Sequence, residues 1–288
     1  MSTAIDLLAP LALIGIGAAY ALRSSTLAGE GRPVPLWRQV SFGAGLLLLV
    51  AADMPPLASI AEELVVAHMA QHLIVADLAA LLVALGLTGP LLQPLLAQRG
   101  LRWLQVFGNP LVALPAWALN LYLWHLSVLY EGVLDSAPLH LLQHAAFFGF
   151  GLAMWMPLFG PLPKPAWFGN AAMAIYVVVV RLAGAVLANV LAWSSSPLYP
   201  AYAAGEADHG ISPLSDQGAA GMVMMVESGL VTLGVLAWII FRWARQDSER
   251  QRLLDLARER GIELDDARAG RAAAAGQGAR LERRLKQS

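Results

Sequence analysis

The chain has 288 residues, of which 58% are hydrophobic and only 14% are charged, and it contains no cysteine. A soluble domain carries about 25% charged residues, so this composition excludes a soluble globular protein, a disordered chain and a fibrous repeat. The near-neutral charge balance gives no reason to expect nucleic-acid binding. The lack of cysteine excludes disulfides, thiolate metal sites and cysteine nucleophiles. We therefore expect an integral membrane protein.

Seven segments, taken in chain order, are long and apolar enough to cross about 30 Å of hydrocarbon as helices. They are residues 4–22, 37–53, 64–86, 110–130, 139–160, 169–193 and 219–241. The first has no basic segment before it, so we do not interpret it as a cleaved signal peptide. Residues 89–107 are apolar but broken by Pro90, Pro94 and Gly100, which favours an interfacial or re-entrant piece. The predicted fold is all-α, an integral membrane bundle of seven transmembrane helices.

In residues 1–245, most of the few basic residues and most of the acidic residues lie at opposite ends of the predicted spans. Basic residues follow spans one, three, five and seven, at Arg23, Arg32, Arg38, Arg99, Arg102, Lys164, Arg242 and Arg245. The N-terminus and the turns after spans two, four and six hold acids instead, at Asp6, Glu62, Glu63, Glu131, Asp135, Glu206 and Asp208. The positive-inside rule then predicts an N-terminus outside and a C-terminus in the cytoplasm, which agrees with an odd number of spans.

The charge distribution also divides the chain into two parts. Residues 1–243 form the predicted seven-helix transmembrane domain, and residues 244–288 form a charged cytoplasmic tail that contains 11 Lys or Arg and 8 Asp or Glu. Leucines at helical spacing, beginning with Leu253 and Leu254, predict a surface helix in this partly helical tail. We expect the helix to fray through the Ala/Gly stretch at 270–279. A solvated tail is the simpler interpretation, and a partner-binding helix is the alternative.

The histidines lie toward the outer side of this topology. Five are near the outer ends of spans, at His68, His72, His125, His140 and His144, and His209 falls in the last outer loop. Two pairs have a spacing of four residues, which places both rings of a pair on one helix face. Two such pairs on facing helices can bring four imidazoles together, and imidazole is a ligand for copper, iron and zinc. A metal or heme site is therefore one hypothesis, and a hydrogen-bonded polar vestibule is the other.

Two methionines are auxiliary candidates for the metal site. Thioethers suit reduced copper, and Met69 adjoins the first histidine pair while Met222 lies near the outer end of span seven. Copper is the expected metal. Heme stays possible, because facing histidine pairs can also supply one axial ligand on either side of a porphyrin.

Three charged residues fall deep within the predicted spans, namely Asp77, Arg181 and Glu227. Asp77 and Arg181 lie at matching depths, and an unpaired charge in hydrocarbon costs several kcal/mol, so we expect an ion pair between them. Glu227 is shallower and is an alternative partner for Arg181. The simpler interpretation of this charge network is a structural latch, and the alternative is a proton or ion pathway.

Three motifs carry a resemblance to a known family. They are AHMAQHLIVADLAALLVALG (67–86), LYLWHLSVLYEGVLDSAPLHLLQHAAFFGFGLAMW (121–155) and SSPLYPAYAAGEADHGISPLSDQGAAGMVMM (195–225). Over residues 35–243 the chain resembles the polytopic CtaG family of bacterial cytochrome c oxidase (caa3-type) assembly factors. The family's motif positions correspond here to His68, Met69, His72, Trp124, His125, His144, Asp216 and Gln217. Ser127 and the Tyr130–Glu131 pair depart from the family pattern, in which a proline and a tyrosine-aspartate are usual.

The resemblance implies a multi-pass protein of the bacterial cytoplasmic (inner) membrane that is needed for oxidase maturation, with copper handled by outer-facing His and Met ligands. Membrane lipid, oxidase subunits and copper chaperones are the implied partners. The sequence contains no metalloprotease, P-loop or nucleophile-elbow motif, so we expect a binding protein and not an enzyme. The alternatives are a heme-binding membrane redox protein and a transporter that uses the Asp77, Arg181 and Glu227 track.

Overall fold

A computed structural model describes residues 2–287, with side chains described from residue 8 onward, so Asp6 lies outside the described side chains. The described residues form helices and no strand, which confirms the all-α prediction. The elements of the first half are α1 (Ser2–Gly29), α2 (Leu36–Ala52), α3 (Leu57–Ala61), α4 (Val65–Leu73), the π-helical segment η1 (Ile74–Ala79), α5 (Ala80–Gly86), α6 (Gly89–Ala97), the 3₁₀ segment η2 (Arg99–Gly108), α7 (Pro110–Trp124) and α8 (Ser127–Gly132). They are followed by α9 (Ala137–Phe159), α10 (Asn170–Trp193), the 3₁₀ turn η3 (Pro200–Tyr202), α11 (Ala203–Asp208), α12 (Pro213–Glu259), α13 (Asp266–Ala274) and α14 (Gly278–Gln287).

Five of the described helices are long and apolar enough to cross a membrane, and a bent pair raises the number to six. The five lie at Leu8–Gly29, Val65–Gly86, Ala137–Phe159, Asn170–Trp193 and Pro213–Glu259. The bent pair is η2 with α7, which meet at 94°. Helix α2 is apolar but has only 17 residues, at the lower limit of spanning length. The protein is thus a helical membrane protein, whereas the count of seven spans stays a prediction.

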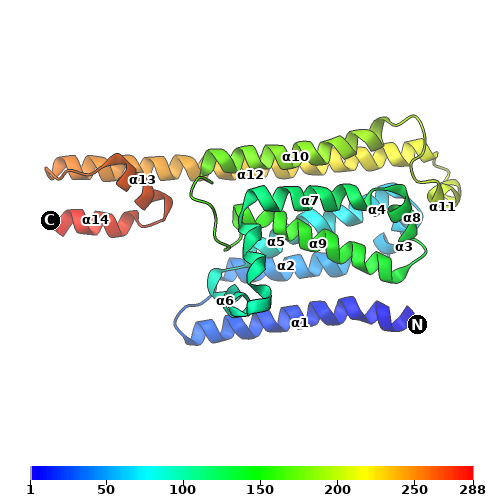
Figure 1. Ribbon diagram of the computed structural model, residues 1–288, viewed down its shortest axis with the longest axis horizontal. Coiled ribbons are helices and arrows are strands. Elements are labelled where there is room, and N and C mark those ends of the chain that lie inside the picture. Colours follow the sequence, from blue (N-terminus) through cyan, green and yellow to red (C-terminus); the bar gives the residue numbers. More distant parts are fainter. Residues whose placement is uncertain (1, 288) are drawn as a thin grey trace. The chain divides into compact units, whose positions relative to one another are not determined.

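The chain divides into two compact units, Met1–Phe168 with Val178–Leu230, and Gly169–Val177 with Val231–Ser288. In the first unit, the continuous run α4–η1–α5 packs against both α2 and α9 (Figure 1). Close approach is possible because Gly151 of α9 lies directly on the carbonyl of Ala76, where a Cβ atom would collide with the backbone. Small residues permit such contacts between helices in lipid, where packing and not hydrophobicity drives association.

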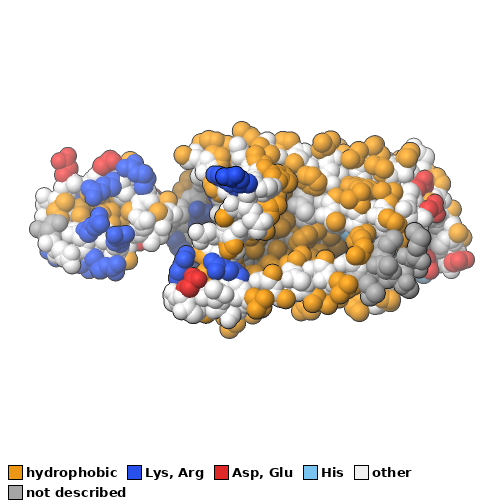
Figure 2. All heavy atoms as spheres, turned by 60° about the horizontal axis from the view of Figure 1, so that its bottom comes forward, with side chains coloured by type: hydrophobic (Ala, Val, Ile, Leu, Met, Phe, Trp, Pro, Cys, Tyr) orange, Lys and Arg blue, Asp and Glu red, His pale blue; other side chains and the backbone are white. Residues whose placement is uncertain are grey.

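The side surface of the first unit is apolar. Hydrophobic side chains cover the flanks of the helices, whereas Asp and Glu side chains gather at one end (Figure 2). Large residues on these flanks are strongly exposed, such as Leu119 at 69%, Leu182 at 61% and Leu230 at 67%. A monomeric soluble protein does not expose so much contiguous apolar surface, so this surface fits contact with lipid.

The structure alters one predicted element of the membrane region and agrees with another. Span four was expected to reach residue 130, but α7 ends at Trp124, and a short separate helix, α8, follows after a break at His125. Residues 89–107 form α6 and most of η2, two short helices of which η2 meets α7 at 94°, in agreement with an interfacial or re-entrant piece.

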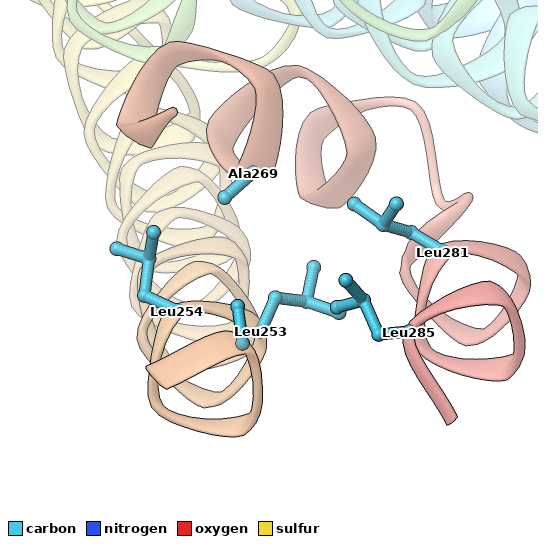
Figure 3. Packing of buried hydrophobic residues seen from close by; sticks show 6 residues of the cluster. Leu253, Leu254, Ala269, Leu281 and Leu285 are labelled. Carbon is cyan, nitrogen blue, oxygen red and sulfur yellow. The ribbon is translucent and has the colours of Figure 1, made fainter. Parts of the chain in front are cut away.

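The tail of the second unit has its own hydrophobic core. Leu253, Leu254 and Ala257 of α12 pack against Ala269 of α13 and against two leucines of α14, Leu281 and Leu285 (Figure 3). The prediction that residues 270–279 fray was wrong, because α13 runs to Ala274 and α14 starts at Gly278. Alanine has the highest helix propensity, and the burial of Ala269 and Ala273 anchors this segment.

Candidate functional site

Five of the six histidines meet in one buried cluster at the end of the first unit where α4 and α9 begin. His68 and His72 come from α4, His125 directly follows α7, and His140 and His144 come from the first turns of α9. The ring centroids of His68 and His140 are 5.9 Å apart, those of His72 and His144 are 5.6 Å apart, and those of His72 and His125 are 6.3 Å apart. The two pairs with spacing of four therefore face each other, as the sequence predicted.

Hydrogen bonds orient three of these rings in the same way. Nδ1 of His125 lies 2.7 Å from the Leu121 carbonyl oxygen, and Nδ1 of His144 lies 3.0 Å from an Asp53 carboxylate oxygen. Nδ1 of His68 lies 3.3 Å from the Ala61 carbonyl oxygen. With the proton on Nδ1, each ring donates to its oxygen and keeps a lone pair on Nε2. Metal-binding histidines are held by such oxygens in the same manner.

Two ring nitrogen atoms of the cluster are buried without a hydrogen-bond partner. Nε2 of His68 and Nδ1 of His72 have no hydrogen-bond partner. Nε2 of His72 lies 3.2 Å from the Gln143 side-chain oxygen, which favours a proton on Nε2 and a lone pair on Nδ1. Nε2 of His140 and Nε2 of His144 are 3.0 Å apart. Buried polar atoms are seldom left without partners, so these lone pairs need an explanation.

Methionine contributes to the cluster at one of the two expected positions. The sulfur of Met69, a residue that is 1% exposed, lies 3.5 Å from Nε2 of His125. Met222 is instead 52% exposed on α12, so the structure does not favour it as a ligand. His209 lies outside the cluster, in the turn between α11 and α12, and pairs with Glu63, with 2.6 Å between Nε2 and a carboxylate oxygen.

Tyrosines cover the cluster on one side. The Tyr202 hydroxyl lies 2.9 Å from Nδ1 of His68, and the Tyr199 hydroxyl donates to the His125 carbonyl oxygen at 3.1 Å. The rings of Tyr130 and Tyr199 stack with centroids 3.9 Å apart. Burial raises the pKa of the Tyr202 hydroxyl well above its ordinary value, so this group stays neutral, and with the proton on Nδ1 of His68 the hydroxyl oxygen accepts the hydrogen bond.

Asp216 and Gln217 of α12 hold the elements around the cluster in place. The Asp216 carboxylate accepts the backbone N–H groups of Val65 at 2.6 Å and Val66 at 3.1 Å, which cap the start of α4. Gln217 accepts the backbone N–H of Leu198 at 2.7 Å and so fixes the loop that carries the tyrosines. An acidic group at a helix N-terminus satisfies free N–H groups and complements the helix dipole. Asp216 thereby orients the helix that bears His68 and His72.

The cluster is a hydrogen-bonded network and not a finished three-ligand centre. Within residues 2–287, no three His, Asp or Glu side chains are placed to hold one metal ion together. A cavity of about 120 Å³ reaches the cluster and is lined by Ala58, Ala61, Glu62, His68, Gln71, Val133, Leu134, Ala137 and His140. Histidine and methionine donors thus lie together beside a small cavity that contains two of the histidines in its wall.

The ion pair expected from the matching depths of Asp77 and Arg181 is present. Both guanidinium NH₂ groups of Arg181 bond to the Asp77 carboxylate, one of them at 3.3 Å, and the side chains are only 11% and 8% exposed. The Trp155 indole N–H donates to the same carboxylate at 3.0 Å. Glu227 lies close enough to interact electrostatically with both charged groups, so it belongs to the same buried network.

Sequence reasoning missed several residues of these two networks. Asp53, Gln143 and Tyr202 bond directly to histidines of the cluster, and Trp155 bonds to Asp77. The helical spacing along α9 could have identified two of them. Gln143 and Trp155 continue the helical stripe that contains His144, whereas Asp53 and Tyr202 lie in turns whose direction the sequence does not specify.

Comparison with known proteins gives one result. Neither the search of curated proteins nor that of solved structures finds a match. The family model described as cytochrome c oxidase caa3 assembly factor matches residues 18–246, which include the histidine cluster, the Asp77–Arg181 pair and Asp216. The chain therefore belongs to the family of cytochrome c oxidase caa3 assembly factors.

Proposed function

We propose that the protein assists oxidase assembly by holding copper as Cu(I) in the histidine–methionine cluster and passing it on. The observation that carries this proposal is the meeting of five histidines and Met69 from three helices in one buried place. Copper in this scheme is cargo, and the protein is a binding protein with no reaction of its own. Oxidase subunits and copper chaperones are the proposed partners.

The chemistry of the donors supports copper over harder cations. Imidazole and thioether are soft or borderline ligands, and thioether selects Cu(I). The cluster contributes Nε2 atoms of His68, His125 and His144 and the sulfur of Met69, which sits beside one of them. The nitrogens of His140 and His144 at 3.0 Å fit either a hydrogen bond or two bonds of about 2 Å to a shared ion. A low number of ligands suits a carrier that must release its metal.

The location of the cluster supports delivery on the outer side of a bacterial cytoplasmic membrane. The acidic residues Glu62, Glu63 and Glu131 lie around the end of the first unit that carries the histidines. By the positive-inside rule, that end faces outward in a seven-span topology with α2 and the bent pair counted as spans. The small cavity beside His68 and His140 would then give an ion a route from the outer aqueous phase.

Copper retention by purified protein tests the binding proposal. The protein is loaded with Cu(I) in detergent, washed against a Cu(I) competitor, and assayed for metal by mass spectrometry. The variant His68→Ala/His72→Ala is expected to lose the copper, whereas His209→Ala, which removes a histidine outside the cluster, keeps it. Unchanged retention in the double variant, or equal loss in both, would contradict the proposal.

A methionine pair gives a second, finer comparison. Met69→Leu keeps the volume but removes the thioether, so it should weaken Cu(I) binding and leave helix content unchanged. Met222→Leu should have no effect because that side chain is exposed. In cells, His68→Ala/His72→Ala should fail to restore caa3-type oxidase activity where His209→Ala restores it.

Heme is the second candidate cargo, and the cavity argues against it. The volume of about 120 Å³ is well below the roughly 300–1,000 Å³ of sites for drug-sized ligands. A visible spectrum of the purified protein distinguishes the two, since a Soret band would overturn the copper proposal.

A further inference from the structure

The tail beyond the family match contains a cavity with an unusual lining. Its volume is about 420 Å³, and it is lined by Arg268, Arg271, Ala272, Ala275, Gln277, Arg280, Leu281 and Arg284. Four of these eight residues are arginines, and none is acidic. A volume in this range is that of a small-molecule site. The cavity lies wholly within the second unit and is separate from the histidine cluster.

The sequence builds this cavity by repeating one spacing on two helices. On α13 the lining positions are 268, 271, 272 and 275, and around α14 they are 277, 280, 281 and 284. Residues with offsets of three, four and seven share one face of an α-helix. Gly276, with a φ of 65°, makes the tight turn that directs both faces into the same space.

The hydrophobic core of the tail holds the backbone of the two helices that carry the arginines. Ala269 and Leu285 are 0% and 5% exposed, and with Leu281 they pack the two helices against Leu253 of α12 (Figure 3). The arginine side chains therefore project from a hairpin whose backbone is held by buried apolar contacts. A preformed cationic site is more useful to a ligand than flexible arginines, because less ordering is needed on binding.

Four of the eight acidic residues of the tail form ion pairs with basic residues outside the cavity lining. Asp247 and Asp266 pair with Arg250, and Asp255 pairs with Arg258. Glu282 pairs with Lys286 and Arg252, and these two cations lower the pKa of its carboxyl group. Within residues 2–287, no ion pair involves Arg268, Arg271 or Arg280. Arg268, Arg271 and Arg280 thus bring positive charge to the cavity wall without an ion pair among the described side chains, and like charges held together are unfavourable unless an anion joins them.

We propose that this hairpin is a binding site for a phosphate-bearing anion. Guanidinium groups form paired hydrogen bonds with phosphate oxygens, which is why arginine prevails in phosphate recognition. The Gln277 amide supplies a neutral donor at the rim. The phosphate can belong to a lipid headgroup or to a soluble compound, since both present the same group.

Hydrogen exchange of the full-length protein in lipid nanodiscs tests the site and identifies the source. In one arm, pyrophosphate is added to nanodiscs of phosphatidylcholine alone. In the other arm, nanodiscs of phosphatidylcholine are compared with nanodiscs that also contain phosphatidylglycerol. The measured segment is residues 266–287. A ligand at ten times its dissociation constant slows exchange through local opening about tenfold.

A charge-matched pair of variants distinguishes phosphate binding at the cavity from general electrostatic attraction of phosphate to the basic tail. Arg271→Gln/Arg280→Gln removes two cavity residues, and Arg260→Gln/Arg283→Gln removes two exposed arginines outside the lining. The first should lose the protection and the second should keep it. Protection by pyrophosphate alone assigns a soluble phosphate compound, and protection by phosphatidylglycerol assigns a headgroup.

Two results would overturn the proposal, namely no protection in either arm and equal loss in both double variants. Exchange of residues 253–257 without ligand reports whether the hairpin core is intact. If the cavity variant disturbs that core, the single substitution Arg268→Gln replaces it in the experiment. Arg268→Gln should then lose the protection, while the control variant keeps it.

Discussion

Removal of Arg181 tests the idea that the buried ion pair holds the central span in place. In Arg181→Gln the Asp77 carboxylate keeps the Trp155 indole N–H at 3.0 Å but loses its cation. Both partners of the pair are almost fully buried, with 11% and 8% of their side chains exposed. Breaking a buried pair from one side costs about 3–5 kcal/mol, because a charge is left without compensation.

Proton uptake sets an upper limit on this loss. A carboxylic acid that titrates near pH 4 in water can be neutralised at pH 7 for about 4 kcal/mol, and at pH 5 for about 1.5 kcal/mol. We therefore expect Arg181→Gln to lose about 3–4 kcal/mol at pH 7 and no more than about 1.5 kcal/mol at pH 5. At about 2–4 °C per kcal/mol, Tm at pH 7 should fall by about 6–16 °C.

Thermal unfolding in detergent at both pH values measures these differences. Asp77→Asn/Arg181→Gln leaves no buried charge in the pair and should recover most of the loss at pH 7. Arg99→Gln, which removes an exposed arginine of α6–η2, serves as the control and should change Tm little. Equal losses in the single and double variants, or a loss in Arg181→Gln that does not depend on pH, would refute the reasoning.

Three further substitutions test packing and positioning. Gly151→Ala should lower stability by about 1–3 kcal/mol through collision with the Ala76 carbonyl, whereas Gly149→Ala, which meets nothing within 4 Å, should not lower it, as parallel Tm measurements would show. Asp216→Ala should destabilise the start of α4 by about 1–2 kcal/mol and weaken Cu(I) retention; retention equal to that of Asp208→Ala would contradict a positioning role. Leu285→Ala should cost the tail core about 2–5 kcal/mol and speed hydrogen exchange in α13 and α14 without changing copper retention.

The sequence contained enough information to place the histidines and the central ion pair. Helical spacing of four grouped His68 with His72 and His140 with His144, and equal depth paired Asp77 with Arg181. These inferences succeed because a membrane span has a fixed rise per residue and a fixed direction. The depth of a residue in the membrane and the helix face on which it lies then follow from its residue number, without knowledge of the tertiary contacts.

Other features depended on contacts that no local pattern specifies. The break after Trp124 and the π-helical turn at Ile74–Ala79 depart from regular α-helix geometry, so angular reasoning along an ideal helix does not carry across them. Asp53 and Tyr202 reach the histidines from turns. The hairpin of the tail formed where an alanine-rich stretch looked too weak to hold, because Leu281 and Leu285 bury it from the next helix.

One face of α9 connects the candidate metal site to the ion pair. His144, Phe147, Gly151 and Trp155 follow one another at spacings of three and four, and all are buried against the run α4–η1–α5 or its neighbours. The ring of Phe147 lies 4.5 Å from that of His72, Gly151 lies on Ala76, and Trp155 donates to Asp77. A single helix face thus supplies a candidate ligand, an apolar contact, a close backbone approach and a polar latch in succession. All four contacts join α9 to the continuous run α4–η1, so the Asp77 latch and the residues His68 and His72 lie on one helical run that packs against one face of α9. Stabilisation of this run by the Asp77–Arg181 pair therefore also stabilises the helix that carries the candidate ligands His68 and His72.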